Sequence, residues 1–204
     1  MVSRYPALNL EKPACFLSYF ILYFRMQSKI KTISELRPLL DILKSAGTKI
    51  VFTNGCFDLI HTGHTRYFAK ARSFGDILVV AVNSDASVRR IKGEKRPINP
   101  QDERAEVLAA LGSVDFVVIF DESDPHKVIA ALQPDVLVKG GDWPVEKIIG
   151  RDIVEARGGT VISVPYIEGA STTGIIEKIL KKYKCLGERE VEKPGRLDGK
   201  KKRY

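Results

Sequence analysis

The sequence predicts an α/β fold, in which a parallel sheet of five strands is covered by helices on both faces. Short apolar runs alternate with longer segments of helical periodicity, which is typical of strand–helix–strand units with right-handed crossovers. One of these runs, residues 77–82 (ILVVAV), is apolar without interruption, as expected for a parallel strand that is buried on both faces. With 204 residues, the chain is long enough to form a single domain with a substantial core.

The elements of the first half can be placed in order. Thr32-Ile33-Ser34-Glu35 precedes a periodic leucine run, so a helix is expected at about 33–46, ending near Gly47. Pro100 stands at a permitted first-turn position and begins a helix that continues to about residue 111. Between these helices we expect a strand at 49–53, a helix at 63–74 that Gly75 stops, the strand at 77–82, and a short helix or loop at 85–91.

The second half continues the alternation and ends in a helix. The expected elements are a strand at 115–120, a helix at 125–132, a strand at 136–139, a helix at 145–157, a strand at 160–164 and a last helix from 171–173 to about 183. Polar segments follow all five strands, at 53–58, 83–85, 121–124, 139–142 and 166–173. Because ligands of such sheets bind beyond the carboxyl ends of the strands, these segments predict one shared site.

The most informative segment is residues 51–64, VFTNGCFDLIHTGH, which contains two of the three histidines of the chain. It predicts a strand, a loop and a helix that begins near residue 62. His61 and His64 are three residues apart and can therefore address one ligand from one face of that helix. Gly63 leaves the backbone open, and the free N–H groups of a helix start favour an anion. The segment therefore predicts a triphosphate site.

Other chemistries receive less support from the motifs. The chain contains neither GxGxxG nor GxxxxGK[ST], which argues against a dinucleotide dehydrogenase and a P-loop kinase. A metal site built from Cys56, His61 and His64 would fit no common zinc spacing, so we expect no protein-bound metal. A loop-capping pair of histidines without a ligand is the remaining structural alternative.

The charge of the chain is concentrated at its ends. The net charge is +8, yet residues 26–180 contain 20 basic and 20 acidic residues, so the predicted domain is balanced. Residues 184–204 are predicted to form a basic, disordered tail, and no specific nucleic-acid partner is expected. Binding of this tail to RNA or to an acidic membrane surface is the alternative.

The N-terminus contains an apolar stretch, ACFLSYFILYF, of about eleven residues, which is too short to span a bilayer. We expect residues 1–25 to be an extension that is untranslated or disordered, residues 26–183 to form the domain, and no stable membrane insertion. A membrane-associated anchor is the alternative. The three cysteines are far apart and odd in number, which predicts no disulfide and a reducing, cytoplasmic location.

Four ordered segments carry a family resemblance. HTGH resembles the HxGH signature of the nucleotidyltransferase superfamily, whose members have a Rossmann-like, doubly wound sheet. Over roughly residues 28–180, the chain resembles the adenylyltransferase domain of bacterial ADP-heptose synthase, in the segments FTNGCFDLIHTGHTRYFAKARSFGDILVVAVNSDASVRRIKG, RPINPQDERAEVLAAL, PDVLVKGGDW and IEGASTTGIIEKI. The glycerol-3-phosphate cytidylyltransferases share HxGH and an EGxSTT segment.

The resemblance implies transfer of AMP from ATP to D-glycero-β-D-manno-heptose 1-phosphate, giving ADP-heptose and pyrophosphate with Mg²⁺, for lipopolysaccharide core synthesis. A homodimer is the default expectation for the oligomeric state. The implied catalytic residues are His61, His64 and Lys92, and the implied substrate-binding residues are Arg104, for the acceptor phosphate, and Asp85. The implied nucleotide-binding residues are Thr53, Asn54, Gly55, Cys56, Phe57, Asp58, Lys139, Gly140, Asp142, Glu168, Gly169, Ser171, Thr172 and Thr173.

Several of these residues have alternative roles. Asp58 is a candidate for orienting His61 or holding Mg²⁺, and Asp142 for binding sugar hydroxyls. Arg104 is alternatively an exposed helix arginine paired with Glu103 or Glu106. The basic cluster Arg89, Arg90, Lys92, Lys95 and Arg96 suits phosphates but is alternatively a solvated surface.

The substrates also have alternatives. The cytidylyltransferases have an arginine–threonine pair where this chain has Tyr166-Ile167, which argues against CTP and glycerol 3-phosphate. Another small phosphate acceptor, or CTP as donor, is the enzymatic alternative. A nucleotide-binding or RNA-associated module is the non-enzymatic one.

Overall fold

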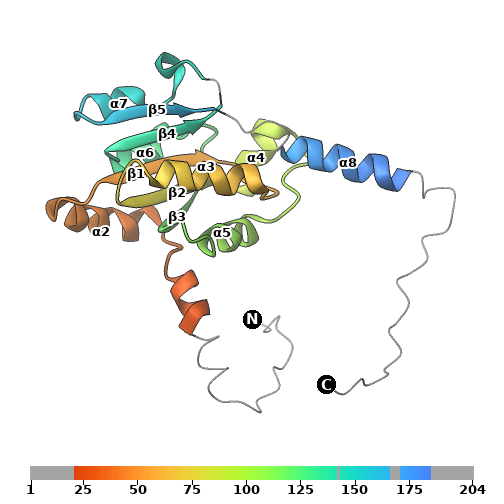
Figure 1. The fold of residues 1–204 in the computed structure, drawn as a ribbon, viewed down its shortest axis with the longest axis horizontal. Coiled ribbons are helices and arrows are strands. Elements are labelled where there is room, and N and C mark those ends of the chain that lie inside the picture. The colour runs from red at the N-terminus through yellow and green to blue at the C-terminus, as the bar shows by residue number, and fades with distance from the viewer. Residues whose placement is uncertain (1–20, 142, 166–170, 185–204) are drawn as a thin grey trace, which may run out of the picture.

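The computed structural model describes residues 21–141, 143–165 and 171–184. Within them, all strand pairs of one five-stranded sheet are parallel, and the strand order is β3-β2-β1-β4-β5 (Figure 1). The prediction of a five-stranded parallel sheet is therefore confirmed. The strands are β1 (Ile50–Gly55), β2 (Ile77–Asn83), β3 (Phe116–Phe120), β4 (Val136–Gly140) and β5 (Thr160–Val164).

The helices lie close to their expected positions. Helix α2 begins at a capping box, in which the Glu35 amide donates to Thr32 Oγ1 over 3.2 Å and the Thr32 amide donates to Glu35 Oε2 over 2.8 Å. The described helices are α2 (Ile33–Ser45), α3 (Thr62–Arg72), α4 (Asp85–Lys92), α5 (Gln101–Ala109), α6 (His126–Leu132), α7 (Arg151–Glu155) and α8 (Thr172–Lys184), together with a short 3₁₀ helix, η1 (Val145–Lys147).

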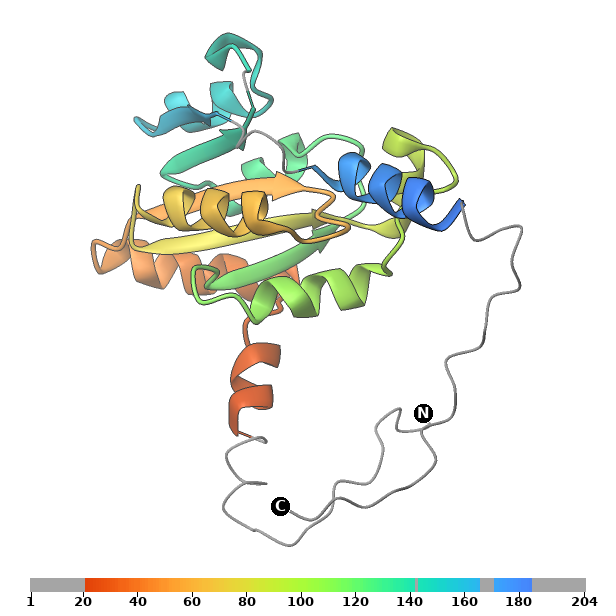
Figure 2. The same cartoon turned by 45° about the vertical axis from the view of Figure 1, so that its right-hand side comes forward.

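Two apolar layers separate the sheet from its helices. Alternate strand residues point to opposite faces, so Ile50 and Phe52 join one core while Val51 joins the other. The first core packs against α2, α6 and α7, and the second against α3 and α5 (Figure 2). The sheet is therefore covered on both faces, which explains the uninterrupted apolar run of β2.

The single helix expected at 145–157 is wrong. The structure forms η1 and α7 instead, separated by Gly150, whose φ is +89°. A Cβ at this position would lie 2.4 Å from Ile129 Cδ1 of α6. The close approach of α6 and the left-handed backbone both require glycine, and a continuous helix could not satisfy either.

The strand order fixes where a ligand can bind. From β1 the chain moves to β2 and β3 on one side, and then returns to place β4 and β5 on the other. The order therefore reverses between β1 and β4, and such a switch point leaves a crevice at the carboxyl ends of the two strands.

The expected boundaries at 26 and 184 fall near the limits of the described residues and stay predictions. Residues 21–27 are helical, with Ile21, Leu22 and Phe24 exposed to solvent. Helix α8 extends away from the sheet (Figure 1). In the part of the chain that the structure describes, none of the helices has the length and apolar character needed to cross a bilayer.

Candidate active site

Strands β1 and β4 bring Asn54 and Lys139 together at the switch point. The Lys139 ammonium donates a hydrogen bond to Asn54 Oδ1 over 3.1 Å. Burial lowers the pKa of Lys139, opposed by the nearby Cys56 thiol and reinforced by the charge of Lys92. Among the described residues no carboxylate forms an ion pair with Lys139. This half-buried cation is therefore well placed to receive an anionic ligand.

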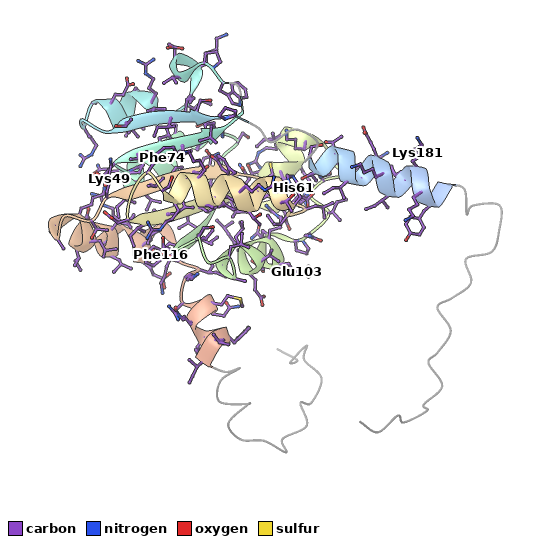
Figure 3. All side chains as sticks on the ribbon, viewed as in Figure 1. Lys49, His61, Phe74, Glu103, Phe116 and Lys181 are labelled. Carbon is purple, nitrogen blue, oxygen red and sulfur yellow. The ribbon has the colours of Figure 1, made fainter. Side chains whose placement is uncertain are left out.

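His61 and His64 form a stacked pair at the start of α3. Their ring centroids are 3.9 Å apart and the ring planes are inclined by 23°. His61 occupies the N-cap position, but its side chain makes no capping hydrogen bond. The loop-capping alternative is therefore wrong. Figure 3 shows His61 at the end of the domain from which α8 leaves, far from Lys49 and Phe74 at the opposite end of the strands.

An aromatic wall supports the second histidine. Phe57 lies edge-on to His64 at a centroid distance of 5.5 Å and to Phe68 at 5.0 Å. Phe57 has a φ of 45°, unusual for a residue with a side chain, and its ring folds back over Gly55. A Cβ on Gly55 would lie 2.9 Å from Phe57 Cζ, so a side chain at residue 55 would displace the Phe57 ring from its place beside His64.

Both histidines are neutral at physiological pH. Burial, with a smaller contribution from the neighbouring His61 ring, lowers the pKa of His64 to about 4. Burial also lowers the pKa of His61. In both rings Nδ1 is buried and has no hydrogen-bond partner among the described residues. Buried polar atoms are normally paired, so two such nitrogens side by side indicate a place that a ligand fills.

The His64 ring should make stability depend on pH. Its folded-state pKa of about 4 lies below the ordinary value of 6.5, so between these values the unfolded chain takes up a proton that the native state does not. The contribution of neutral His64 to the unfolding free energy is therefore fully present above pH 6.5, and it is lost as the pH falls towards 4. Allowing for partial exposure of the ring, we expect this residue to remove ~1–2 kcal/mol of unfolding free energy between pH 7 and pH 5.

Urea unfolding at these two pH values measures the effect. The His64→Gln variant should show a smaller loss of unfolding free energy on acidification than the wild type. An equal loss in both proteins would contradict the low pKa of His64.

Lys92 is the last residue of α4 and is exposed. Burial raises the pKa of the Cys56 thiol, and the charges of Lys92, Arg104, Arg96 and Lys139 oppose this rise. The effect of Lys92 on both Cys56 and Lys139 means that its ammonium lies within electrostatic range of the crevice.

The rest of the basic cluster divides into two kinds. Arg96 forms an ion pair with Asp58 over 2.6 Å, and Arg90 donates to the Asp121 carbonyl and to Ser123 Oγ. Arg89 and Lys95 are exposed, as is Lys92. The cluster is therefore neither wholly a phosphate site nor wholly a solvated surface.

One residue expected to contact the nucleotide forms an internal hydrogen bond. The Thr53 side chain is fully buried, and its Oγ1 lies 2.6 Å from the Tyr67 hydroxyl of α3. Tyr67 also donates to the Val138 carbonyl over 3.1 Å and packs beside Gly140. Tyr67 thus ties α3 to β1 and β4. Sequence reasoning missed it, because an aromatic residue on the buried face of a helix looks like an ordinary core residue.

The expected roles of Asp58 are not supported. Its carboxylate accepts hydrogen bonds from Arg96 and from the amides of Ile98 and Asn99, rather than from His61. Burial alone would raise the pKa of Asp58, but these bonds outweigh it and hold the pKa below its usual value. With its oxygens occupied and its side chain buried, Asp58 is poorly placed to hold a metal.

Arg104 and Asp85 pair with each other. Arg104 Nη2 lies 2.8 Å from Asp85 Oδ1, and the Arg104 side chain is fully buried. The alternative of an exposed helix arginine paired with Glu103 or Glu106 is therefore wrong. The guanidinium is directed to protein oxygens, and the contact with an acceptor phosphate expected by resemblance stays a prediction.

The start of α8 comes close to the loop that precedes His61. Thr172 Oγ1 donates to the Leu59 carbonyl over 3.4 Å, and Ser171 Oγ accepts from the Gly174 amide over 3.0 Å. The structure thus brings Ser171, Thr172 and Thr173 to the same end of the sheet as the histidines. Asp142, Glu168 and Gly169, and the Tyr166-Ile167 pair, lie outside the described residues.

The chain is similar to several known proteins. The family model described as cytidylyltransferase-like matches residues 52–178. The bifunctional protein HldE of Citrifermentans bemidjiense is 57% identical over 156 residues, and that of Geobacter sulfurreducens is 54% identical over the same length. Each match covers 76% of this chain but 32% of the relative, so the chain spans about a third of the length of these proteins.

One solved structure is also similar. The lipopolysaccharide core biosynthesis protein from Thermoplasma volcanium GSS1 has a TM-score of 0.50 and 29% sequence identity, and the match covers 61% of this chain and all of that one.

Proposed function

Because the chain belongs to the cytidylyltransferase-like family, we propose that it is an adenylyltransferase that transfers AMP from ATP to D-glycero-β-D-manno-heptose 1-phosphate. The observation that carries this proposal is the stacked, neutral His61–His64 pair with its two unpartnered nitrogens, at the start of α3 and on the carboxyl side of the strands. The four ordered sequence segments and the identity to HldE proteins support the heptose phosphate as acceptor.

The reaction needs positioning and charge stabilisation. An oxygen of the sugar phosphate attacks the α-phosphorus of ATP, the bond between that phosphorus and the β-bridging oxygen breaks, and pyrophosphate leaves with the bonding electrons. The sugar phosphate is already a nucleophile, so no covalent enzyme intermediate is required. His61 and His64 donate ring N–H groups to the triphosphate, and Lys92 and Lys139 stabilise the charge that develops on it.

The other proposed contacts follow the sheet edge. Asn54, Gly55, Cys56 and Gly140 lie at or directly after the carboxyl ends of β1 and β4, and the hydroxyls of residues 171–173 with the first amides of α8 suit the β- and γ-phosphates. Asp142, Glu168 and Gly169 remain proposed nucleotide contacts on the resemblance alone.

Mg²⁺ would be bound chiefly by the ATP phosphates. Among the described residues there is no group of three or more histidine, cysteine or carboxylate side chains that could hold a metal ion. Mg²⁺ with one or two protein ligands and several phosphate oxygens is the usual arrangement in such sites, and it supplies charge neutralisation. We also propose a cytoplasmic enzyme, since ATP is its donor, and a homodimer, which light scattering of the full chain would measure.

The test measures pyrophosphate release by the full chain with Mg²⁺, for ATP and CTP, against sugar 1-phosphates and glycerol 3-phosphate. We expect turnover with ATP and the heptose 1-phosphate. CTP is tested as the alternative donor because the matching family model is described as cytidylyltransferase-like. Turnover with CTP alone would keep the transfer chemistry but overturn ATP as the proposed donor. Absence of turnover with every pair would overturn the enzymatic proposal in favour of a nucleotide-binding or RNA-associated module.

A further inference from the structure

Two buried charged side chains, Asp58 and Arg104, hold the loop between α4 and α5, residues 93–100. Asp58 lies in the loop that leads to His61, and Arg104 lies on α5. Their exposed fractions are 2% and 1%. Charged groups buried this deeply are strongly destabilising unless they are fully paired. The groups that form hydrogen bonds with Asp58 and Arg104 therefore indicate what these two residues do.

Asp58 fastens one side of the loop. Its Oδ2 lies 2.8 Å from the Ile98 amide and 2.6 Å from Arg96 Nε, and its Oδ1 lies 2.9 Å from the Asn99 amide. Asn99 Nδ2 in turn donates to the Asp58 carbonyl over 3.1 Å. Four hydrogen bonds, one with an ion pair, therefore join the loop before His61 to the loop after Lys92.

Arg104 fastens the other side. Its Nε donates to the Asn99 carbonyl over 3.0 Å, its Nη1 to the Cys56 carbonyl, and its Nη2 to the Asn83 carbonyl and to Asp85 Oδ1, each over 2.8 Å. The planar guanidinium thus joins the ends of β1 and β2 to the same loop. Lysine has no such fork of donors and could not make these contacts together.

We propose that Arg104 and Asp58 are positioning residues that lock loop 93–100 onto the loop before His61, and so fix the position of Lys92 at the end of α4. Lys92 is exposed at the end of α4 and directly precedes Gly93, whose φ is +90°. Together with the backbone hydrogen bond from the Arg96 amide to the Gly93 carbonyl, the contacts of Asp58 and Arg104 restrict the chain that follows Lys92. A misplacement of about 1 Å at such a site can reduce turnover about 100-fold. This kinetic consequence rests on the proposed function, whereas the lock itself does not.

The test compares Arg104→Lys with Arg37→Lys in the full chain. Arg37 is a matched control, because it also donates to a carboxylate, a carbonyl and a side-chain amide, but it lies on α2. Without substrate, we expect the Ile98 and Asn99 amides to exchange with deuterium at least about tenfold faster in Arg104→Lys, and at the wild-type rate in Arg37→Lys. With substrates, kcat should fall about 10- to 100-fold while KM for the sugar phosphate stays within about threefold of the wild type.

Asp58→Asn tests the lock from its other side and also covers the case in which Arg104→Lys does not fold. It removes the Arg96 ion pair and should accelerate the same two amides. Wild-type exchange in the folded variants would overturn the lock. A selective rise in KM for the sugar phosphate, with unchanged kcat and exchange, would instead make Arg104 a ligand of that phosphate. Absence of wild-type turnover would count against the proposed function alone, since the exchange measurement needs no substrate.

Discussion

Replacing His64 with alanine is expected to reduce kcat for adenylyl transfer by about 100- to 1000-fold, the usual effect of removing one preorganised donor from a developing charge. The His64 ring is held by Phe57 and by the stacked His61 ring, so little reorganisation is needed when charge develops on the phosphate. The ring is neutral in the resting site, with a pKa near 4, and it can therefore strengthen its hydrogen bond as negative charge grows.

The third histidine provides the control. His126 lies on α6, is half exposed, and pairs only loosely with Asp152, over 3.4 Å. His126→Ala should keep kcat within about twofold of the wild type, as surface substitutions usually do. His64→Ala must also remain folded near pH 7, which its melting temperature shows. A folded His64→Ala enzyme that retains wild-type kcat would remove His64 from the catalytic proposal.

The sheet and its ligand-binding end could be predicted from the sequence because both depend on local pattern. Apolar runs such as residues 77–82 have the length of strands, and a polar segment follows each of them. Every expected strand is present, within a few residues of its expected bounds. The three-residue spacing predicted that His61 and His64 lie together, although His61 has an extended backbone at the N-cap of α3 rather than a helical one.

The partners of charged residues could not be predicted in the same way. A sequence gives the charge of Asp58, Asp85 and Arg104 but not the distant atoms that each one meets. Arg104 donates to Cys56, which is 48 positions earlier, and Asp58 accepts from Asn99, 41 positions later. The same limit applies to Gly150, where the packing of Ile129 from another helix decides the break. Resemblance assigned Asp58, Asp85 and Arg104 to ligands, whereas the hydrogen bonds that these residues make in the structure are to other protein groups.

Lys139→Met is expected to reduce activity without reducing the stability of the fold. The substitution keeps the approximate volume of the side chain but removes a charge that burial disfavours, as the lowered pKa of Lys139 indicates. A buried cation with a neutral amide as its hydrogen-bond partner contributes little to folding, so the melting temperature should stay equal or rise. In contrast, kcat/KM for ATP should fall about 100-fold, because the triphosphate loses a charge-assisted contact at the switch point.

Lys127→Met is the matched control, since the Lys127 side chain is 80% exposed and its interaction with Glu122 spans 3.5 Å. It should leave both the melting temperature and kcat/KM unchanged. Thermal unfolding and steady-state kinetics of the two variants therefore show whether Lys139 stabilises the fold or binds the ligand. If its role were structural, Lys139→Met would melt at a lower temperature and keep the wild-type kcat/KM per folded molecule. Equal or higher stability with a large loss of kcat/KM is the combination that only a ligand-binding cation produces, because such a charge is unfavourable in the empty site and is compensated when the phosphates arrive.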